Sequence, residues 1–371
     1  MSHANDVVII GGGAAGCATA YYLAQAGVSS LIIEREGIAG NASGYNAGGL
    51  NPLQGAGIPG PLAPLAVESF KMHQELSASL LHETGIDFHH KSIVMVTVAF
   101  NESELAAMHE TYNIFQAADG FSAHWVDAAD LRQLEPRLSS AAIQGLYTYG
   151  NATLSSYEYV TALYQAAKRC GTRMYPGLAT GFKTSGERVT GVMLEDGEVD
   201  CETVVVASGP WSGEAGTWLG VNIPVEPLKG EIVRIEPPGT PLQADFSGAG
   251  SSLYQRADGL IWVGSTEERV GFDKEPRESS RHKLLDGAIK LMPSIREAKV
   301  VKHTACLRPV TLDWLPIIGR APGWENVYLA TGAGKKGILI SPGIGKATAD
   351  LITGGKTGIA IDSFAPERFS D

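Results

Sequence analysis

Apolar residues near the start of the chain form one unbroken run that passes directly into glycines. Residues 7–10 (VVII) are all β-branched, which is typical of a strand buried on both faces. Residues 11–16 (GGGAAG) follow at once, and the small and apolar residues 17–25 predict a helix that ends near Gly27. Residues 29–34 (SSLIIE) predict a second strand. The pattern therefore predicts a β-α-β unit.

Hydrophobic spacing also predicts elements along the rest of the chain. Residues 40–65, rich in Gly, Asn, Ser and Pro, indicate a long loop. Short alternating runs over residues 225–265 are typical of an antiparallel sheet. A last helix is expected to open at residues 332–337 and to end near Leu351. Helical spacing predicts further helices over residues 65–82, 102–117, 157–169 and 279–291, and apolar runs predict strands over 91–100, 189–194, 203–207 and 327–331.

Units of nucleotide-binding type at both ends of the chain, with β-rich material between them, predict an α/β fold with an inserted second domain. A discontinuous, Rossmann-like cofactor domain is expected over residues 1–88, 151–222 and 301–371. The inserted substrate domain, an α+β unit with an antiparallel sheet, is expected over residues 89–150 and 223–300.

The first glycines have the spacing of a dinucleotide-binding turn. Gly11 permits the tight turn, Gly13 lets the backbone approach a pyrophosphate, and Gly16 lets the helix pack close to the strand. The phosphate charge would lie at the helix N-terminus, where the free N–H groups around Ala14 and Ala15 favour an anion. The alternative is a glycine-rich turn with a purely structural role.

Glu34 ends the second predicted strand, where a carboxylate accepts hydrogen bonds from the ribose hydroxyls of a dinucleotide. The same carboxylate would repel a 2′-phosphate, which argues against NADP, and Arg35 follows it. A later apolar strand ends in the small residues Ala207, Ser208 and Gly209. Such a strand end can run beside the pyrophosphate of FAD as a second contact.

The composition narrows the classes of partner. The 371 residues are 44% hydrophobic and 19% charged, as in an ordinary globular protein. The net charge of −11 lowers the expectation of a nucleic-acid partner, because phosphates attract basic surfaces. No stretch approaches the ~20 apolar residues that span a bilayer, and no signal-peptide pattern opens the chain, so a cytoplasmic location is expected. Four cysteines without a CxxC pair are interpreted as reduced and buried: Cys17, Cys170, Cys201 and Cys306.

Several segments in matching order resemble the D-amino-acid oxidase (DAO) superfamily of FAD-dependent flavoproteins, most closely its glycine oxidase and sarcosine oxidase branch. The resemblance covers nearly the whole chain. It is strongest over residues 7–34, 204–212 (VVVASGPWS), 227–231 (PLKGE), 307–309 (LRP) with 313–319, and 330–345. It implies an extended FAD, bound without a covalent link, with its ring at the interface of the two domains.

The resemblance also implies which positions surround the cofactor. The backbone of Thr180 is expected beside the adenine, and Trp211 belongs to the matching segment 204–212. Gly332, Gly334, Gly337 and Ile338 match the loop and helix start at the pyrimidine end of the flavin. The loop expected beside the ring carries Ser43, Asn46, Ala47, Gly48, Gly49 and Leu50.

Lys335 and Lys336 lie at this last helix start. A reduced flavin carries negative charge near N1 and O2, and a helix N-terminus with a nearby cation stabilises that charge. At least one of the two lysines is therefore expected beside the ring. The alternative is that both are solvated surface side chains.

Arg308 is the candidate for substrate recognition. It lies in an apolar setting (CLRP), where a cation needs a partner, and its planar fork matches a carboxylate. The resembling family holds the substrate carboxylate with an Arg at this position, whereas the alternative is a structural pair with a carboxylate such as Asp313. Cys306, two residues earlier, does not match the expected position for tethering FAD.

Two positions in the expected pocket depart from glycine oxidase. Ser252 stands where that branch has a Tyr, and Tyr254 lies on the same strand face, where it could compensate. Glu267 stands where an apolar residue would be expected. Its carboxylate could attract a substrate amine or turn to solvent, and Tyr254 and Glu267 are therefore candidate catalytic residues beside Arg308.

The resemblance implies FAD-dependent oxidation of a small amino acid or N-alkyl amino acid at its C–N bond. A hydride would pass to flavin N5, and the resulting imine would hydrolyse. This chemistry needs little acid–base help, so the lack of a candidate histidine base is no objection. His89 and His90 lack ligand spacing, and no metal is expected.

Other activities stay open at this point. One is oxidation of a 2-hydroxy acid or polyol phosphate, which usually requires a general base to remove the hydroxyl proton. Others are a flavin module that cleaves a carboxymethylamino group on tRNA, and an FAD-binding protein without activity. Oxygen or another electron acceptor would reoxidise the flavin, and the family leaves a homo-oligomer open.

Overall fold

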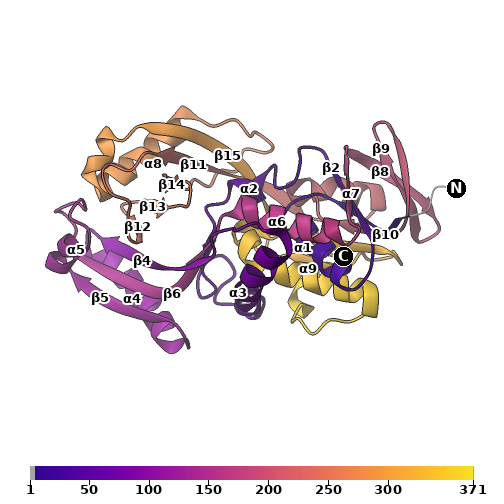
Figure 1. The fold of residues 1–371 in the computed structure, drawn as a ribbon, viewed down its shortest axis with the longest axis horizontal. Coiled ribbons are helices and arrows are strands. Elements are labelled where there is room, and N and C mark those ends of the chain that lie inside the picture. The colour runs from indigo at the N-terminus through magenta and orange to yellow at the C-terminus, as the bar shows by residue number, and fades with distance from the viewer. Residues whose placement is uncertain (1–4, 371) are drawn as a thin grey trace.

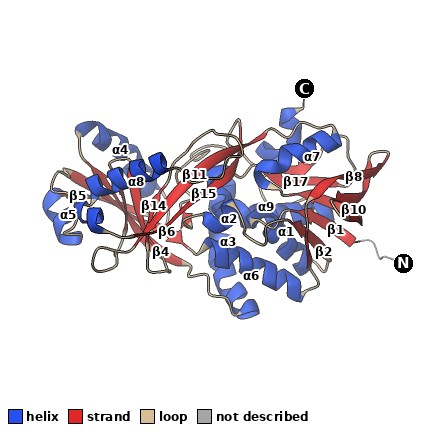
Figure 2. Ribbon diagram, turned by 90° about the horizontal axis from the view of Figure 1, so that it is seen from above, coloured by secondary structure: helices blue, strands red, loops and turns tan. Residues whose placement is uncertain are grey.

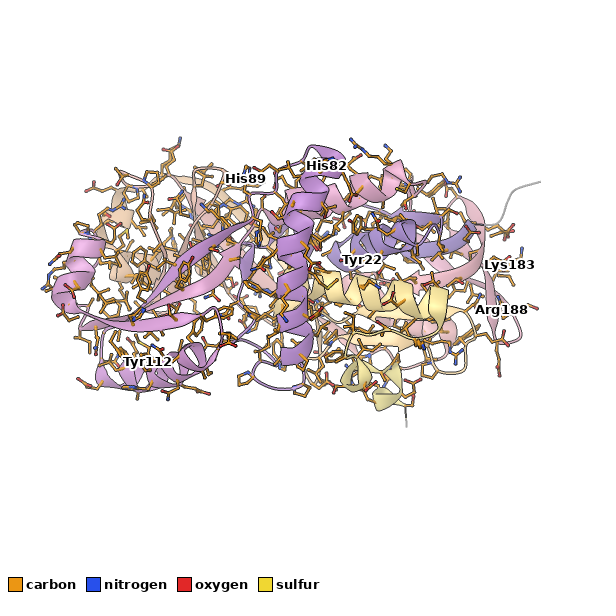
Figure 3. All side chains as sticks on the ribbon, turned by 60° about the horizontal axis from the view of Figure 1, so that its bottom comes forward. Tyr22, His82, His89, Tyr112, Lys183 and Arg188 are labelled. Atoms are coloured by element: carbon orange, nitrogen blue, oxygen red, sulfur yellow. The ribbon has the colours of Figure 1, made fainter. Side chains whose placement is uncertain are left out.

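Two β-sheets organise the protein, and the computed structural model describes them within residues 5–370. Each sheet forms the centre of one lobe, and both chain ends lie in the lobe of the first sheet (Figure 1). Side chains of Lys183 and Arg188 mark the outer end of this lobe, and Tyr112 belongs to the other lobe (Figure 3).

The first sheet is mainly parallel, in the strand order β16-β17-β10-β1-β2-β7, with the hairpin β8–β9 attached to β10. The apolar run of residues 7–10 forms most of β1, which pairs in parallel with β10 on one side and β2 on the other. Val8 and Ile9 are fully buried, as the run predicts. The strands are β1 (Asn5–Ile10), β2 (Ser30–Glu34), β7 (Arg173–Pro176), β8 (Ala179–Ser185), β9 (Arg188–Leu194), β10 (Gly197–Val206), β16 (Ile317–Arg320) and β17 (Val327–Thr331).

Helices flank the first sheet (Figure 2). Apolar residues of α1, α3, α6 and α9 pack with Val7 and Ile9, whereas α7 and the β8–β9 hairpin pack with Val8 and Ile10. Helices α1 and α9 approach closely, because a Cβ on Gly345 would lie only 2.5 Å from the Cβ of Ala18. The helices are α1 (Ala14–Gln25), α2 (Ala42–Tyr45), α3 (Ala63–Thr84), α6 (Ser156–Arg169), α7 (Ser212–Leu219) and α9 (Gly337–Gly354).

The second sheet is mainly antiparallel, in the order β15-β11-β14-β13-β12-β4-β6-β3, with β5 paired to β6. Helix α8 packs on one face, and α4 and α5 contact the β4–β6 region. The strands are β3 (Gly49–Leu50), β4 (Lys91–Ala99), β5 (Ser122–Asp127), β6 (Gln144–Thr153), β11 (Val225–Ile235), β12 (Asp245–Gly248), β13 (Ser251–Gln255), β14 (Ile261–Gly264) and β15 (Val300–Thr311), and the helices are α4 (Glu102–Ala117), α5 (Ala128–Leu134) and α8 (Glu278–Leu291).

Successive side chains of the second sheet alternate between its two faces. Val96 and Val233 belong to the core that contains α8. Their neighbours Met95 and Ile232 line a cavity on the opposite face. This alternation gives the substrate-side lobe one face for stability and one face for a ligand.

The predicted fold class is confirmed: a Rossmann-like α/β unit joined to a second unit with a mostly antiparallel sheet. The sheets divide the chain differently from the predicted ranges, however, since β3 and β15 belong to the second sheet. We therefore propose that the substrate domain includes Gly49–Leu50 and Val300–Thr311 in addition to residues 89–150 and 223–300.

The predicted helices over residues 65–82, 102–117, 157–169 and 279–291 are present within about two residues at each end. The strands that lie where the pattern predicts none are β3, β5, β6, β7, β8, β15 and β16. The prediction of four buried cysteines is wrong for Cys170, which is exposed because α6 ends there in a turn at the surface. Within residues 5–370, no helix has the length and apolar character needed to cross a membrane.

Candidate active site

One cavity extends from the carboxyl ends of the parallel strands in the first sheet to the open face of the second sheet. Its wall includes Gly11 after β1, Glu34 at the end of β2, Ala207 after β10 and Thr331 at the end of β17. Ligands of open α/β sheets bind at this edge, beside the strand where the order reverses. The position of the cavity therefore follows from the topology of the first sheet.

The glycine-rich turn after β1 has no room for larger side chains. Gly11 has a φ of 113°, and a Cβ there would lie 2.3 Å from the carbonyl oxygen of Ala207. A Cβ on Gly16 would lie 2.0 Å from the carbonyl oxygen of Gly11. Helix α1 begins at Ala14, whose N–H donates to Ser43 Oγ over 2.9 Å. The turn thus fits a dinucleotide pyrophosphate at the start of α1.

Glu34 occupies the position expected for ribose recognition. Its carboxylate lines the cavity and accepts hydrogen bonds from the N–H of Gly12 over 2.8 Å and of Glu36 over 2.7 Å. The Arg35 guanidinium lies 4.0 Å from the ring centre of Trp211. These groups fit the adenosine half of FAD.

A segment of the substrate domain reaches across to the same end of the cavity. We call residues 267–277 the strap. Phe272 stacks on Trp211 with 5.7 Å between ring centres, and Lys274 Nζ lies 2.9 Å from Glu36 Oε1. Between these two residues, Asp273 pairs with the fully buried Lys229 over 3.2 Å and so ties the strap to β11.

The loop expected beside the flavin ring lines the middle of the cavity. Gly48 has a φ of 77°, and a Cβ there would lie 1.8 Å from the carbonyl oxygen of Leu154. Asn46 Oδ1 accepts a hydrogen bond from the Gly48 N–H over 2.6 Å. The backbone of Ala47 accepts a hydrogen bond from Arg256, so this loop is tied to the second sheet.

The two lysines before α9 have different surroundings. Lys335 pairs with Glu267 over 2.8 Å, and both side chains are partly exposed. Lys336 is largely enclosed and donates to the Asn51 carbonyl oxygen over 3.0 Å. The pKa of Lys336 is lowered to about 8, mainly by burial and secondarily by the positive charge of Lys335. Lys336 is therefore the more enclosed of the two cations at the start of α9.

Arg308 lies in the cavity wall on β15. Its Nη1 donates to the Thr266 carbonyl oxygen over 3.0 Å and its Nη2 to Ser265 Oγ over 2.9 Å. Gly230 leaves room for the guanidinium, since a Cβ there would lie 2.2 Å from Nη2. Within the described residues no carboxylate pairs with Arg308, and Asp313 pairs with Arg368 instead. The alternative of an Arg308–Asp313 pair is therefore wrong.

A buried ion pair lies beside Tyr254 in the part of the cavity wall that the second sheet forms, here called the roof. Arg256 donates to both carboxylate oxygens of Asp245, each over 3.0 Å. Burial raises the pKa of Asp245, and Arg256 acts in the opposite direction. Tyr254 lines the cavity, and burial raises the pKa of its hydroxyl. The phenol is therefore neutral and able to donate a hydrogen bond.

Most of the predicted site residues meet at this cavity, but four do not line it. The wall beside the expected adenine position is formed by Gly177, Leu178 and Ala179, rather than by Thr180. Glu267 lies outside the wall and is turned to Lys335. Gly16 and Gly48 lie behind the wall, where they permit close packing. The predicted residues in the wall are Gly11, Gly13, Ala14, Ala15, Glu34, Arg35, Ser43, Asn46, Ala47, Gly49, Leu50, Ala207, Ser208, Gly209, Trp211, Tyr254, Arg308, Gly332, Gly334, Lys335, Lys336, Gly337 and Ile338.

Several wall residues were outside the sequence prediction. Asp245 and Arg256 give a weak signal, because both charges adjoin apolar strand segments and need partners. Asn151 and Met95 carry no recognisable motif. Cys306 also lines the cavity, and burial raises the pKa of its thiol, which makes it a poor nucleophile. FAD bound without a covalent link stays a prediction.

Comparisons with known proteins agree on one family. The sequence profile of the DAO family, described as FAD dependent oxidoreductase, matches residues 6–351. The chain is 31% identical to a glycine oxidase of Pseudomonas putida over 368 residues, which is 98% of each chain. It is 29% identical to a glycine oxidase of Geobacillus kaustophilus over 370 residues, 99% of this chain and 98% of that one. The crystal structure of glycine oxidase from Geobacillus kaustophilus superposes with a TM-score of 0.92 at 28% identity, covering 99% of both chains.

Proposed function

Since the chain belongs to the DAO family of FAD-dependent oxidoreductases, we propose that it oxidises the C–N bond of a small amino acid or N-alkyl amino acid whose carboxylate binds Arg308. The supporting observation is that Arg308 lines the cavity without a carboxylate partner among residues 5–370. A guanidinium in this setting needs an anion, and its planar fork fits a carboxylate.

The protein residues have three tasks in this reaction. Arg308 fixes the carboxylate and so orients the Cα–H bond, and Thr266 and Ser265 hold the guanidinium in place. The neutral Tyr254 hydroxyl and the apolar side chains Ile232 and Met95 form the roof. When bound, FAD supplies the acceptor for the hydride that leaves Cα. The resulting imine is hydrolysed by water to an oxo acid and an amine.

The cavity gives little support to oxidation of a hydroxy acid. That reaction requires a general base to remove the hydroxyl proton, and histidine is the most common general base. Among the described residues, no histidine lines the cavity. The carboxylate of Asp245 is already held by two hydrogen bonds from Arg256. A tRNA substrate is disfavoured by the net charge of −11.

An absorbance spectrum of the purified protein without oxygen tests the proposal. Donors would be added one at a time: glycine, sarcosine, D- and L-amino acids, iminodiacetate and 2-hydroxy acids. We expect the flavin to bleach with at least one amino or N-alkyl amino acid and with none of the hydroxy acids. Bleaching by a hydroxy acid alone would reject the proposal.

Substitution of Arg308 tests the assigned residue. Arg308→Met should keep the flavin spectrum and weaken the binding of the best donor by roughly 100-fold, because a charge-assisted pair is lost. Arg308→Lys keeps the positive charge but not the planar fork. Its affinity for the donor should therefore lie between those of the wild type and Arg308→Met. Arg320→Met changes an exposed arginine on β16 and is the control. An unchanged donor dissociation constant in Arg308→Met would refute the role of Arg308.

We further propose a cytoplasmic enzyme in which oxygen or another acceptor reoxidises the flavin. The four cysteines are unpaired, as expected in a reducing compartment. Hydrogen peroxide formed in step with donor consumption would identify oxygen as the acceptor. Turnover that requires an added dye or quinone would identify a dehydrogenase.

A further inference from the structure

An irregularity in the second sheet brings an asparagine to the cavity. The register of β4 against β6 shifts between Ser92 and Val94, so that Gly150 and Asn151 together face Ile93. Two residues opposite one is a β-bulge, a feature that re-aims side chains beside functional sites. Gly150 has a φ of 109°, which a glycine adopts without strain. The bulge places Asn151 in the cavity wall.

The carboxamide of Asn151 is buried and has no partner. The residue is only 2% exposed, and within residues 5–370 neither Oδ1 nor Nδ2 makes a hydrogen bond. Asn326 is buried to a similar degree and is fully bonded: its Oδ1 accepts from Val189, and its Nδ2 donates to Val189 and Glu202. Among the described residues, Asn151 is also the one unpartnered buried side chain in the wall of this cavity. Buried amides are normally satisfied, so a ligand is expected to complete this one.

The position of Asn151 indicates which part of a ligand it meets. The next residue, Ala152, pairs with Leu50 of β3, and Asn51 follows and accepts the hydrogen bond from Lys336. Asn151 therefore belongs to the end of the cavity that holds Lys336. Glu34 and its neighbours form the adenosine end, in the first sheet, so an extended FAD places its ring near Asn151.

The pyrimidine edge of the flavin ring presents an N3–H donor between two carbonyl oxygens. A carboxamide presents an acceptor and a donor side by side, the complement of this edge. The same two-point match lets Asn bind the edge of a nucleobase. We propose that Asn151 recognises the pyrimidine edge of FAD, with Oδ1 accepting from N3–H and Nδ2 donating to one flanking carbonyl.

This assignment concerns the cofactor, so it does not depend on which donor the enzyme oxidises. It adds a side-chain contact to a ring that is otherwise expected to meet loop backbone and the start of α9. The amide donor and Lys336 would act together, because both stabilise the negative charge that the pyrimidine ring gains on reduction. Recognition of the ring would therefore be coupled to its redox chemistry.

The test uses FAD and 3-methyl-FAD, in which a methyl group replaces the N3 hydrogen. Apoprotein is prepared from the wild type, Asn151→Ala and the control Tyr149→Phe, which changes an exposed residue of the same strand outside the cavity wall. The dissociation constant of each flavin is measured by fluorescence quenching. The wild type and Tyr149→Phe should bind FAD roughly 10- to 100-fold more tightly than 3-methyl-FAD. Asn151→Ala should bind FAD more weakly, and its preference should fall to roughly threefold or less.

Each result decides the proposal. A wild type that does not distinguish the two flavins would overturn it, and so would an Asn151→Ala variant that keeps the full preference. Asn151→Ser serves if the alanine variant does not fold, with the same expected loss of preference. Unchanged FAD binding together with weaker donor binding would assign Asn151 to the substrate and reject the flavin contact. Donor oxidation by the wild type is scored separately, so failure of the proposed activity does not affect this test.

Discussion

At the scale of single residues, the cavity holds two kinds of cation. Lys335 and Arg256 have carboxylate partners in Glu267 and Asp245. Arg308 and Lys336 have none within the described residues, and both lie in the cavity wall. These two unpaired charges match the two negative charges of the proposed reaction, the substrate carboxylate and the reduced flavin. The presence or absence of a carboxylate partner therefore distinguishes the structural cations from those proposed to be functional.

Lys336→Met should lower the midpoint potential of the bound flavin at pH 7. Loss of an enclosed cation worth about 1.4 kcal/mol to the reduced state corresponds to roughly 30 mV for a two-electron couple. The difference from wild type should shrink at pH 9.5, because the wild-type lysine loses its charge as the pH rises through its pKa of about 8. Spectroscopic redox titration gives the potentials, and Lys346→Met, an exposed position, is the control. Equal potentials at pH 7 would place the reduced ring away from Lys336.

Gly11→Ala should destabilise the protein and abolish FAD binding. The alanine would have to adopt a φ of 113°, and its Cβ would lie 2.3 Å from the backbone oxygen of Ala207. The turn must therefore open to accommodate it. Gly27→Ala is a matched control, because Gly27 has a φ of 76° but nothing within 4 Å of an added Cβ. The control should lose about 1 kcal/mol of unfolding free energy from backbone strain alone. Thermal unfolding of both apoproteins and FAD titration measure the difference. Similar losses in both variants would show that the contact with Ala207 is unimportant.

At the scale of elements, the strap connects the two domains beside Trp211 and Glu36, where the adenosine half of FAD is expected. It begins in the substrate domain, and Phe272 and Lys274 contact Trp211 and Glu36 of the cofactor domain. The ion pair is partly exposed and therefore contributes little. The aromatic contact is the stronger candidate for holding Trp211 at the cavity wall.

Phe272→Ala should raise the dissociation constant of FAD by roughly 2- to 10-fold. An aromatic pair is worth about 0.5–1.5 kcal/mol, and its loss frees Trp211 to move from the wall. Leu81→Ala removes a similarly exposed apolar side chain from α3 and should leave FAD binding unchanged. Titration of apoprotein with FAD distinguishes the two. Equal affinities of Phe272→Ala and wild type would mean that the strap does not support the cofactor.

At the scale of the whole molecule, the cavity wall is shared by both sheets. Gly11, Glu34 and Lys336 belong to the cofactor domain, whereas Arg308 and Tyr254 belong to the second sheet. The Arg256 contact to Ala47 and the strap also join the domains. A ligand that fills the cavity therefore contacts both domains at once.

FAD should raise the melting temperature of the apoprotein in a single shared transition. Free FAD at 100 times its dissociation constant stabilises the folded state by about 2.7 kcal/mol, which is a shift of several degrees. Differential scanning calorimetry of apo- and holoprotein measures it. Two transitions, of which FAD moves only one, would show that the cofactor couples to one domain alone. Size-exclusion chromatography of the same samples would report whether the enzyme is a homo-oligomer.

The sequence alone determined the features that depend on neighbouring residues. The run of residues 7–10, the glycines at 11, 13 and 16 and the position of Glu34 specify a strand, a tight turn and a carboxylate at the end of the second strand within one β-α-β unit. The amphipathic helices were equally clear, because their spacing repeats locally. The resemblance to the DAO superfamily then supplied the distant positions, including Arg308 and residues 332–338.

Tertiary structure decided every feature that depends on residues far apart in the chain. It paired Asp313 with Arg368 and left Arg308 without a carboxylate partner among the described residues, and it enclosed Lys336 while pairing Lys335 with Glu267. No local pattern contains these outcomes, because each depends on which strands and loops meet. The bulge that turns Asn151 to the cavity is likewise a property of two paired strands. The tight turn before α1 therefore arises from a local motif, whereas the pairing of charges around the cavity arises from contacts between distant segments.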